Sequence, residues 1–260
     1  MQETVTNALK VTLGEGRPVI GSYITIGSPA IAEIMALAGF DFLTVDLPNT
    51  SLSLETAEGI VRAVEVMGKV PVLRVPDRQA VTIGRALDTG ALGVEVPGVA
   101  TAEEARQVVQ AAKYYPEGSR RAATPRAARY SAIPVSTYFG QANKETMVIV
   151  HCDTTKALAN LPEILAVEGI DVVYVGPYEI AQALGAPGQV NLPAVQEALR
   201  GALATIIASG VAAGTTALSA AHARLLIQRQ VRYLTLGRDY LYLLHGCRND
   251  LTEARRPEKQ

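Results

Sequence analysis

Short runs rich in Val, Ile, Leu, Tyr and Thr recur along the chain, and most of them precede a segment with helical periodicity. The runs predict eight strands, at residues 19–26, 41–47, 71–75, 93–99, 147–153, 171–177, 211–217 and 233–239. Apolar residues recur at helical spacing in the segments 30–37, 54–67, 81–87, 102–112, 156–165 and 192–207. Strands that alternate with helices in this number predict one parallel (β/α)8 barrel, the TIM-barrel fold.

A doubly wound open sheet also alternates strands with helices, but it often carries a glycine-rich turn after its first strand. No G-x-G-x-x-G follows the first predicted strand here. Ser28, Thr101 and Thr154 stand where helix N-caps are expected. We therefore expect residues 1–260 to form a single barrel domain.

The longest interruption in the pattern is the segment 114–143, which lies before the fifth strand. Four arginines fall within it: Arg120, Arg121, Arg126 and Arg129. A long loop on a barrel commonly serves as a lid or as an oligomer contact, and we predict one of these roles for the segment.

Composition narrows the classes of partner. The chain has 260 residues, of which 48% are hydrophobic and 19% charged, and no apolar run approaches the ~18 residues of a membrane span. A net charge of −1 predicts no nucleic-acid partner and no anionic membrane surface, which leaves small molecules. The N-terminus lacks a signal-peptide pattern, so we expect a cytoplasmic protein. Cys152 and Cys247 predict neither a zinc site nor a disulfide, and Cys152 is expected in the core.

Active sites of (β/α)8 barrels lie at the C-terminal ends of the strands. Polar residues stand at four of these ends: Asp46 and Asn49 after the second predicted strand, Arg74 on the third, His151 and Asp153 on the fifth, and Glu179 after the sixth. Gly176, Pro177 and Tyr178 precede Glu179, and we expect the backbone amides there to meet a substrate carboxylate at a helix N-terminus.

Several longer motifs resemble a known family. They are GFDFLTVD, PVLRVP, RALDTGALGVEVPGV, TAEEARQVVQAAKYYPEGSR and NLPEILAVEGIDVVYVGPYEIAQALG. These stretches resemble the HpcH/HpaI aldolases, metal-dependent class II enzymes that cleave 2-keto-3-deoxy acids to pyruvate and an aldehyde. The resemblance runs from about Gly16 to about Asp239, and YYPEGSR and VEGID-x-x-x-VGP are its most specific parts.

The resemblance implies roles for four matching positions. Arg74 corresponds to the arginine that holds the keto oxygen and the enolate, and Asp88 to a helix aspartate that supports the catalytic base. Asp153 and Glu179 correspond to the metal-binding glutamate and aspartate, with the two side-chain lengths exchanged. Oxygen ligands suit Mg²⁺ or Mn²⁺, and Co²⁺ is a further alternative. A structural role remains open for each residue: an N-cap or surface charge for the carboxylates, and an ion pair with Asp46 or Asp88 for Arg74.

The family's catalytic histidine lies in a D-x-E-H motif that reads Asp46-Leu47-Pro48-Asn49 here. Asn49 cannot exchange a proton near neutral pH, so it can position a substrate or water but cannot be the base. His151 shares a strand face with Asp153, because side chains alternate along a strand. His151 is therefore a relocated base, a third metal ligand, or a hydrogen-bonded residue with no catalytic role.

Three functions remain open from the sequence. The first is an aldolase-like enzyme that acts on a metal-chelated 2-keto acid, pyruvate or oxaloacetate, without a nucleotide cofactor. The second is a citrate synthase of the siderophore-pathway type, which some relatives are and which takes acetyl-CoA as co-substrate. The third is a degenerate barrel that binds a keto acid without turnover. The resemblance further implies a homo-oligomer built from dimers that exchange their last helices, as in hexameric relatives.

Overall fold

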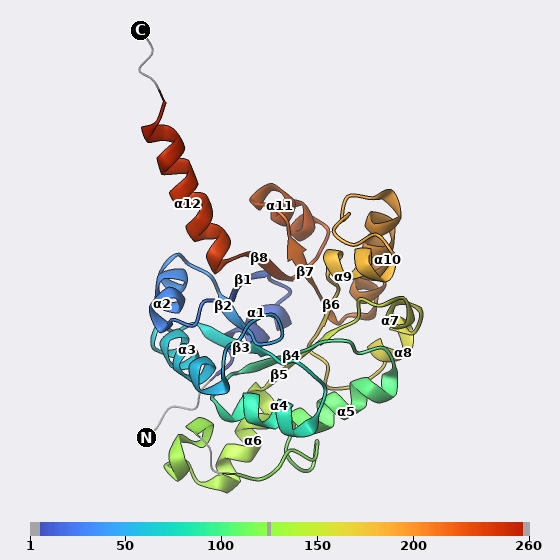
Figure 1. The fold of residues 1–260 in the computed structure, drawn as a ribbon. Helices are drawn as coiled ribbons and strands as arrows, with labels where there is room; N and C mark the ends of the chain where they lie inside the picture. The colour runs from blue at the N-terminus through green and yellow to red at the C-terminus, as the bar shows by residue number, and fades with distance from the viewer. Residues whose placement is uncertain (1–5, 124–125, 257–260) are drawn as a thin grey trace.

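Eight parallel strands form a closed barrel in the order in which they occur along the chain (Figure 1). The structure is a computed structural model and describes residues 6–123 and 126–256. The strands are β1 (Val19–Ile24), β2 (Phe42–Asp46), β3 (Val70–Arg74), β4 (Gly93–Val96), β5 (Met147–His151), β6 (Val172–Tyr174), β7 (Ala212–Ala217) and β8 (Tyr233–Arg238). The predicted (β/α)8 fold is confirmed, and each predicted strand is present.

Twelve α-helices and one 3-10 helix accompany the strands in the described residues. The helices before β5 are α1 (Ala8–Gly14), α2 (Pro29–Leu37), α3 (Leu54–Val66), α4 (Ala80–Asp88), α5 (Ala102–Ala112), η1 (Arg126–Ser131) and α6 (Val135–Glu145). Those after β5 are α7 (Thr155–Ala159), α8 (Leu161–Leu165), α9 (Pro177–Ala183), α10 (Pro193–Ser209), α11 (Ala220–Gln228) and α12 (Asp239–Ala254). The side chains of Thr101 and Thr154 cap their helices as predicted, whereas Ser28 occupies an N-cap position without a side-chain bond.

Alternation along each strand divides the apolar residues into two layers. One set faces the helices and forms the larger core, which includes the buried Cys152. The other set fills the barrel interior, where the rings of Phe42 and Tyr233 stack with centroids 4.4 Å apart. Leu9 of α1 joins this inner cluster, so α1 closes the barrel at the N-terminal ends of the strands. The opposite end, where β2 ends in Asp46 and β3 in Arg74, carries polar side chains.

The segment 114–143 does not form a lid. Its second half folds largely as η1 and α6, and residues 124–125 within it lie outside the described residues. Arg126 donates a hydrogen bond to the carbonyl of Thr89, which follows the C-terminal end of α4. A segment between a helix and the next strand lies at the N-terminal end of a barrel, away from the βα loops. The prediction of a lid was wrong for this reason, and an oligomer contact stays a prediction.

Helix α12 projects away from the barrel (Figure 1). Its apolar side chains Tyr240, Leu243, Leu244 and Leu251 are exposed. An exposed apolar helix fits an intersubunit contact, and the exchange of this helix between subunits stays a prediction. Among the described residues, no helix is long and apolar enough to span a membrane, and Cys152 and Cys247 are both free thiols.

Candidate active site

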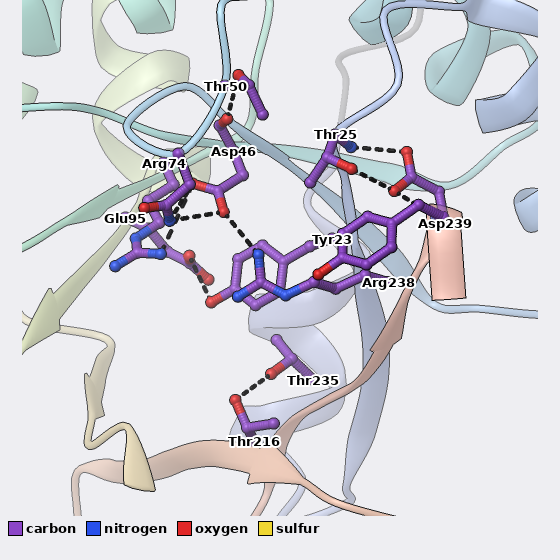
Figure 2. Close-up of polar contacts among 12 residues, drawn as sticks. Tyr23, Thr25, Asp46, Thr50, Arg74, Glu95, Thr216, Thr235, Arg238 and Asp239 are labelled. Carbon is purple, nitrogen blue, oxygen red and sulfur yellow. Dashed lines mark hydrogen bonds and ion pairs between the residues drawn. The ribbon is translucent and has the colours of Figure 1, made fainter. Parts of the chain in front are cut away.

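The side chains of Asp46 on β2 and Arg74 on β3 meet at the C-terminal end of the barrel (Figure 2). Glu179, at the start of α9, lies on the other side of Arg74. The guanidinium of Arg74 lies between two carboxylates, with Nη1 3.6 Å from Oδ1 of Asp46 and Nη2 3.8 Å from Oε1 of Glu179. Asp46 is fully buried, whereas 41% of the Glu179 side chain is exposed. The structure therefore brings together three of the residues predicted from the sequence, one of which faces solvent.

Arg74 is held inside the barrel mouth with unused donor capacity. Only 8% of its side chain is exposed, and its Nε has no hydrogen-bond partner. Burial lowers the pKa of Arg74, but Tyr23, Asp46, Glu95 and Glu179 outweigh burial and raise it above the ordinary value. Arg74 is thus a fixed cation whose planar fork suits a carboxylate or enolate.

Asn49 occupies the position of the family's histidine and binds the neighbouring aspartate. Its Nδ2 lies 3.2 Å from Oδ1 and 2.9 Å from Oδ2 of Asp46. The hydroxyl of Thr50 donates to the Asp46 carbonyl at 2.6 Å and fixes this turn after β2. The amide therefore donates to the carboxylate that an imidazole at this position would also meet.

His151 lies deep in the barrel between two carboxylates. Its Nε2 is 3.6 Å from Oε2 of Glu95, and its Nδ1 is 3.6 Å from Oδ2 of Asp153. The imidazole stacks on Tyr174 with centroids 4.4 Å apart. Burial lowers the pKa of His151, but the contacts with Asp153 and Glu95 raise it to about 9. The imidazole is therefore a cation at neutral pH, with both N–H groups too far from the carboxylates for good hydrogen bonds.

Glu95 supplies the negative charge below His151. It is fully buried and accepts hydrogen bonds from the hydroxyls of Tyr233 at 2.9 Å and Tyr23 at 3.3 Å. Burial raises the pKa of Glu95, but His151, Arg74 and Tyr233 hold it below the ordinary value. An ionised glutamate inside the barrel thus stabilises the cationic form of His151.

Asp153 and Glu179 converge on the backbone of Gly176, the N-cap of α9. A Cβ at Gly176 would collide with Oε2 of Glu179 and lie 3.6 Å from Oδ2 of Asp153. Oδ2 of Asp153 is buried and has no hydrogen-bond partner. No group of three or more His, Cys, Asp and Glu side chains within residues 6–123 and 126–256 is arranged to hold a metal. The pair therefore offers two carboxylates only, and Glu179 lies where a side chain at position 176 would displace it.

Asp88 does not join this site within one chain. It ends α4 and accepts a hydrogen bond from Arg120 at 2.6 Å. The guanidinium carbon of Arg120 lies over the ring of Tyr114, 4.6 Å from the ring centroid. A cavity of about 570 Å³, which Arg120 also lines, lies at this end of the barrel among α3, α4, η1 and α6. The predicted support of the catalytic base by Asp88 has no contact in the single chain, because α4 runs from the C-terminal end of the barrel to the N-terminal end.

The sequence prediction missed Glu95, Tyr23 and Arg238. Nη1 of Arg238 lies 3.1 Å from Oδ2 of Asp46, and its guanidinium lies over Tyr23, 4.9 Å from the ring centroid (Figure 2). Glu95 had a signal, since a charged residue inside the apolar run GVEVPGV must face the barrel interior or the helices. Arg238 follows a register shift in β8 that alternation alone does not predict.

Comparison with known proteins finds one family, and several aldolases, that the chain resembles over most of its length. The profile of a family described as HpcH/HpaI aldolase/citrate lyase matches residues 20–245. A hydroxypyruvate/pyruvate aldolase of Cupriavidus necator is 36% identical over 93% of this chain and 90% of its own length. A 4-hydroxy-2-oxo-heptane-1,7-dioate aldolase of Salmonella arizonae is 35% identical over 93% and 92%. An HpcH/HpaI aldolase/citrate lyase family protein of Burkholderia cenocepacia superimposes with a TM-score of 0.92 at 31% identity, covering 96% of this chain and 100% of that one.

Proposed function

The chain belongs to the HpcH/HpaI aldolase/citrate lyase family, and we propose from this premise that it is a lyase that breaks or forms a carbon–carbon bond next to the carbonyl of a 2-keto acid. The observation that carries the proposal is the placement of Arg74 beside Glu179, while Asp153 and Glu179 converge on Gly176. A fixed guanidinium next to paired carboxylates is the donor set that a metal-chelated keto acid requires.

The carboxylate pair fits a divalent cation. Oδ2 of Asp153 is an unpartnered buried oxygen, and the absence of a side chain at Gly176 leaves room between it and Glu179. Asp153 and Glu179 would hold the ion, and the remaining coordination positions would go to the keto acid and water. When bound, the cation supplies a Lewis acid that polarises the keto oxygen. Mg²⁺ and Mn²⁺ suit these oxygen donors, with Co²⁺ as the alternative.

Arg74 binds and orients the substrate in this proposal. Its fork donates to the keto-acid oxygens and stabilises the negative charge that grows on the enolate oxygen. The carboxylates of Asp46 and Glu179 flank the guanidinium at 3.6 and 3.8 Å and leave its N–H groups available to the substrate. Gly176, Pro177 and Tyr178 form the backbone beside the carboxylate of the keto acid, at the start of α9.

His151 handles the proton in this proposal. In cleavage, the substrate's 4-hydroxyl gives its proton to water, C4 becomes the aldehyde carbon as the electrons of the C3–C4 bond form the enolate, and C3 of the enolate takes up a proton to become the methyl of pyruvate. His151 holds a proton at neutral pH and lies beside Asp153, so it donates that proton. The imidazole then regains a proton from water. In condensation the neutral imidazole, whose proton has passed to water, removes a proton from the methyl of pyruvate. A third-ligand role has less support, because no three His, Cys, Asp or Glu side chains in the part of the chain that the structure describes are arranged to hold a metal.

Two alternatives make different predictions. A citrate synthase would consume acetyl-CoA with oxaloacetate, and basic side chains such as the arginines of 114–143 would have to meet the phosphates of coenzyme A. Arg120 and Arg126 pair instead with Asp88 and Glu65 at the other end of the barrel. A binder without turnover would bind a keto acid and leave the methyl protons of pyruvate in place.

The test combines cleavage, binding and exchange. We expect release of pyruvate from a 4-hydroxy-2-keto acid with Mg²⁺, Mn²⁺ or Co²⁺, loss of this activity with EDTA, and deuterium uptake at the pyruvate methyl by NMR. Pyruvate binding by isothermal titration without cleavage or exchange would support the binder instead. Consumption of acetyl-CoA with oxaloacetate, and no cleavage, would support the synthase.

A further inference from the structure

Arg238 faces the site because of a bulge in β8. Tyr233 and Thr235 of this strand point into the barrel, and simple alternation would place Gly237 there next. The register between β1 and β8 shifts instead, from Gly21 opposite Thr235 to Tyr23 opposite Arg238. Gly237 has φ +63°, a conformation that favours glycine. A bulge re-aims a side chain, and here it turns an arginine toward Tyr23 and Asp46.

The backbone after Arg238 is fixed as well. The carboxylate of Asp239 accepts hydrogen bonds from the amide of Thr25 at 2.7 Å and from its hydroxyl at 2.5 Å (Figure 2). It also accepts one from the amide of Ile26 at 2.6 Å. These bonds join the loop after β1 to the start of α12. The position of Arg238 at the barrel mouth is therefore set by contacts on both sides of the bulge.

The guanidinium of Arg238 is held in place by protein contacts, but some of its N–H groups have no hydrogen-bond partner in the described residues. Its Nη1 contacts Asp46 at 3.1 Å and the group lies over the ring of Tyr23 at 4.9 Å. Within the described residues, Nη1 is the one side-chain nitrogen of Arg238 that donates to the protein, and 30% of the side chain is exposed. Asp46 already has Asn49 and Arg74 as partners. Arg238 thus presents free donors toward the site entrance.

Four charged groups form a row of alternating sign across the barrel mouth. Glu179, Arg74, Asp46 and Arg238 follow one another with gaps of 3.8, 3.6 and 3.1 Å. We propose that Arg238 determines substrate specificity by binding a second carboxylate of the substrate, while Arg74 binds the keto-acid end. The proposal rests on the proposed function, because the keto acid sets the direction in which the substrate extends along the row. The second carboxylate belongs either to the aldehyde part or to the keto-acid part.

The test compares substrates that differ in that carboxylate alone. Cleavage of 4-hydroxy-2-oxoheptanedioate is measured against cleavage of 4-hydroxy-2-oxoheptanoate, which carries the charge difference on the aldehyde part. A second comparison measures Mn²⁺-dependent binding of oxaloacetate and of 2-oxobutanoate. These two compounds differ by one carboxylate on the keto-acid part. For Arg238→Gln, we expect the preference for the dicarboxylate to fall about 10- to 100-fold in one of these pairs, as for a lost charge-assisted hydrogen bond. The preference is the ratio of kcat/KM for the dicarboxylate to that for 4-hydroxy-2-oxoheptanoate, or the Kd of 2-oxobutanoate divided by that of oxaloacetate. The pair whose preference falls shows whether the second carboxylate belongs to the aldehyde part or to the keto-acid part.

Two further variants make the result specific. Arg238→Lys keeps the charge without the fork, and its ratio should lie between those of the parent and Arg238→Gln. Arg78→Gln is the matched control, since Arg78 lies after β3 on the same face and pairs with Glu104 at 3.0 Å. If the preference reflected the general charge of this face, Arg78→Gln would lower the ratio as much as Arg238→Gln.

Each outcome decides the proposal. Equal ratios in the parent and in both Arg238 variants overturn the role of Arg238 and leave the proposed function standing, provided that the neutral substrate is cleaved. A parent that cleaves neither substrate and binds neither keto acid contradicts the proposed function, and this inference with it. If Arg238→Gln does not fold, the same ratios for Arg238→Lys decide the matter.

Discussion

Asn49 donates from a single amide nitrogen to both carboxylate oxygens of Asp46, at 3.2 and 2.9 Å. Asn49 therefore occupies the place next to an aspartate where the family's motif has its histidine. The aspartate that would orient an imidazole there is Asp46, three residues earlier in the chain, because Asp88 is paired with Arg120 at the other end of the barrel.

Asn49→His should raise retro-aldol activity. An imidazole hydrogen-bonded to Asp46 supplies a base close to Arg74, and general bases contribute about 100-fold or more. We expect kcat for a 4-hydroxy-2-keto acid to rise at least ~10-fold, measured by coupled detection of pyruvate. Adding Asp46→Asn should cancel the gain, because the imidazole then lacks its orienting carboxylate. A kcat that stays at the parent value in Asn49→His would contradict this account of the motif.

His151→Gln should remove proton exchange at the methyl of bound pyruvate. Glutamine keeps a hydrogen-bonding side chain between Glu95 and Asp153 but cannot cycle a proton. We expect Mn²⁺ affinity to change little and deuterium uptake, followed by NMR, to fall about 100-fold or more. Uptake at the parent rate would show that another group moves the proton.

His151 should also make stability depend on pH in the presence of EDTA. Its folded pKa of about 9 lies above the ordinary value of 6.5. The stabilisation is therefore fully present below pH 6.5 and is lost as the pH rises through 9. The shift corresponds to roughly 3 kcal/mol. Urea unfolding at pH 6 and pH 9.5 should show a larger loss of stability for the parent than for His151→Gln, and equal losses would contradict the shift.

Asp153→Ala and Glu179→Ala should each abolish binding of a divalent metal. Two carboxylates converge on Gly176, and removal of either leaves one charged donor for a hard cation. Isothermal titration with Mn²⁺ measures the loss, and Glu163→Ala on α8 is a control for acidic residues outside the site. Unchanged Mn²⁺ affinity in either variant would remove that residue from the metal site.

Arg74→Lys should lose activity much more than stability. Lysine can keep one ion pair with Asp46 or Glu179, but it has no fork for the keto acid. We expect kcat/KM to fall about 100-fold and the melting temperature to change by only a few degrees. A large drop in melting temperature with keto-acid affinity retained would show that Arg74 is structural.

The sequence by itself determined the barrel. Apolar runs of strand length and helix-periodic segments are local patterns, and they placed β1 to β8 and most of the outer helices. The predicted helix 156–165 is divided at Asn160 into α7 and α8, since Pro162 lacks the N–H that a continuous helix uses. Helix α6 escaped prediction because its apolar residues are few and pack locally, as Tyr138 and Phe139 do against Tyr114.

Alternation along single strands also predicted which residues share the site. Asp46, Arg74, His151 and Asp153 end parallel strands on one face, so a barrel must bring them to one end. The same local rule placed Cys152 in the outer core. These predictions needed no knowledge of partners across the barrel.

Only the tertiary structure decided how these residues are paired. Asp153 and, from a different strand, Glu95 favour the protonated form of His151. The direction of α4 places Asp88 at the N-terminal end of the barrel, away from the candidate site. Arg238 reaches Asp46, 192 residues away in sequence, through a one-residue shift in β8. Such contacts depend on the register between strands and on closure of the barrel, and a one-residue shift moves a side chain from one face to the other. Local sequence patterns determine neither the register between strands nor the closure of the barrel. The charge pairing at the candidate site is therefore known only from the closed barrel.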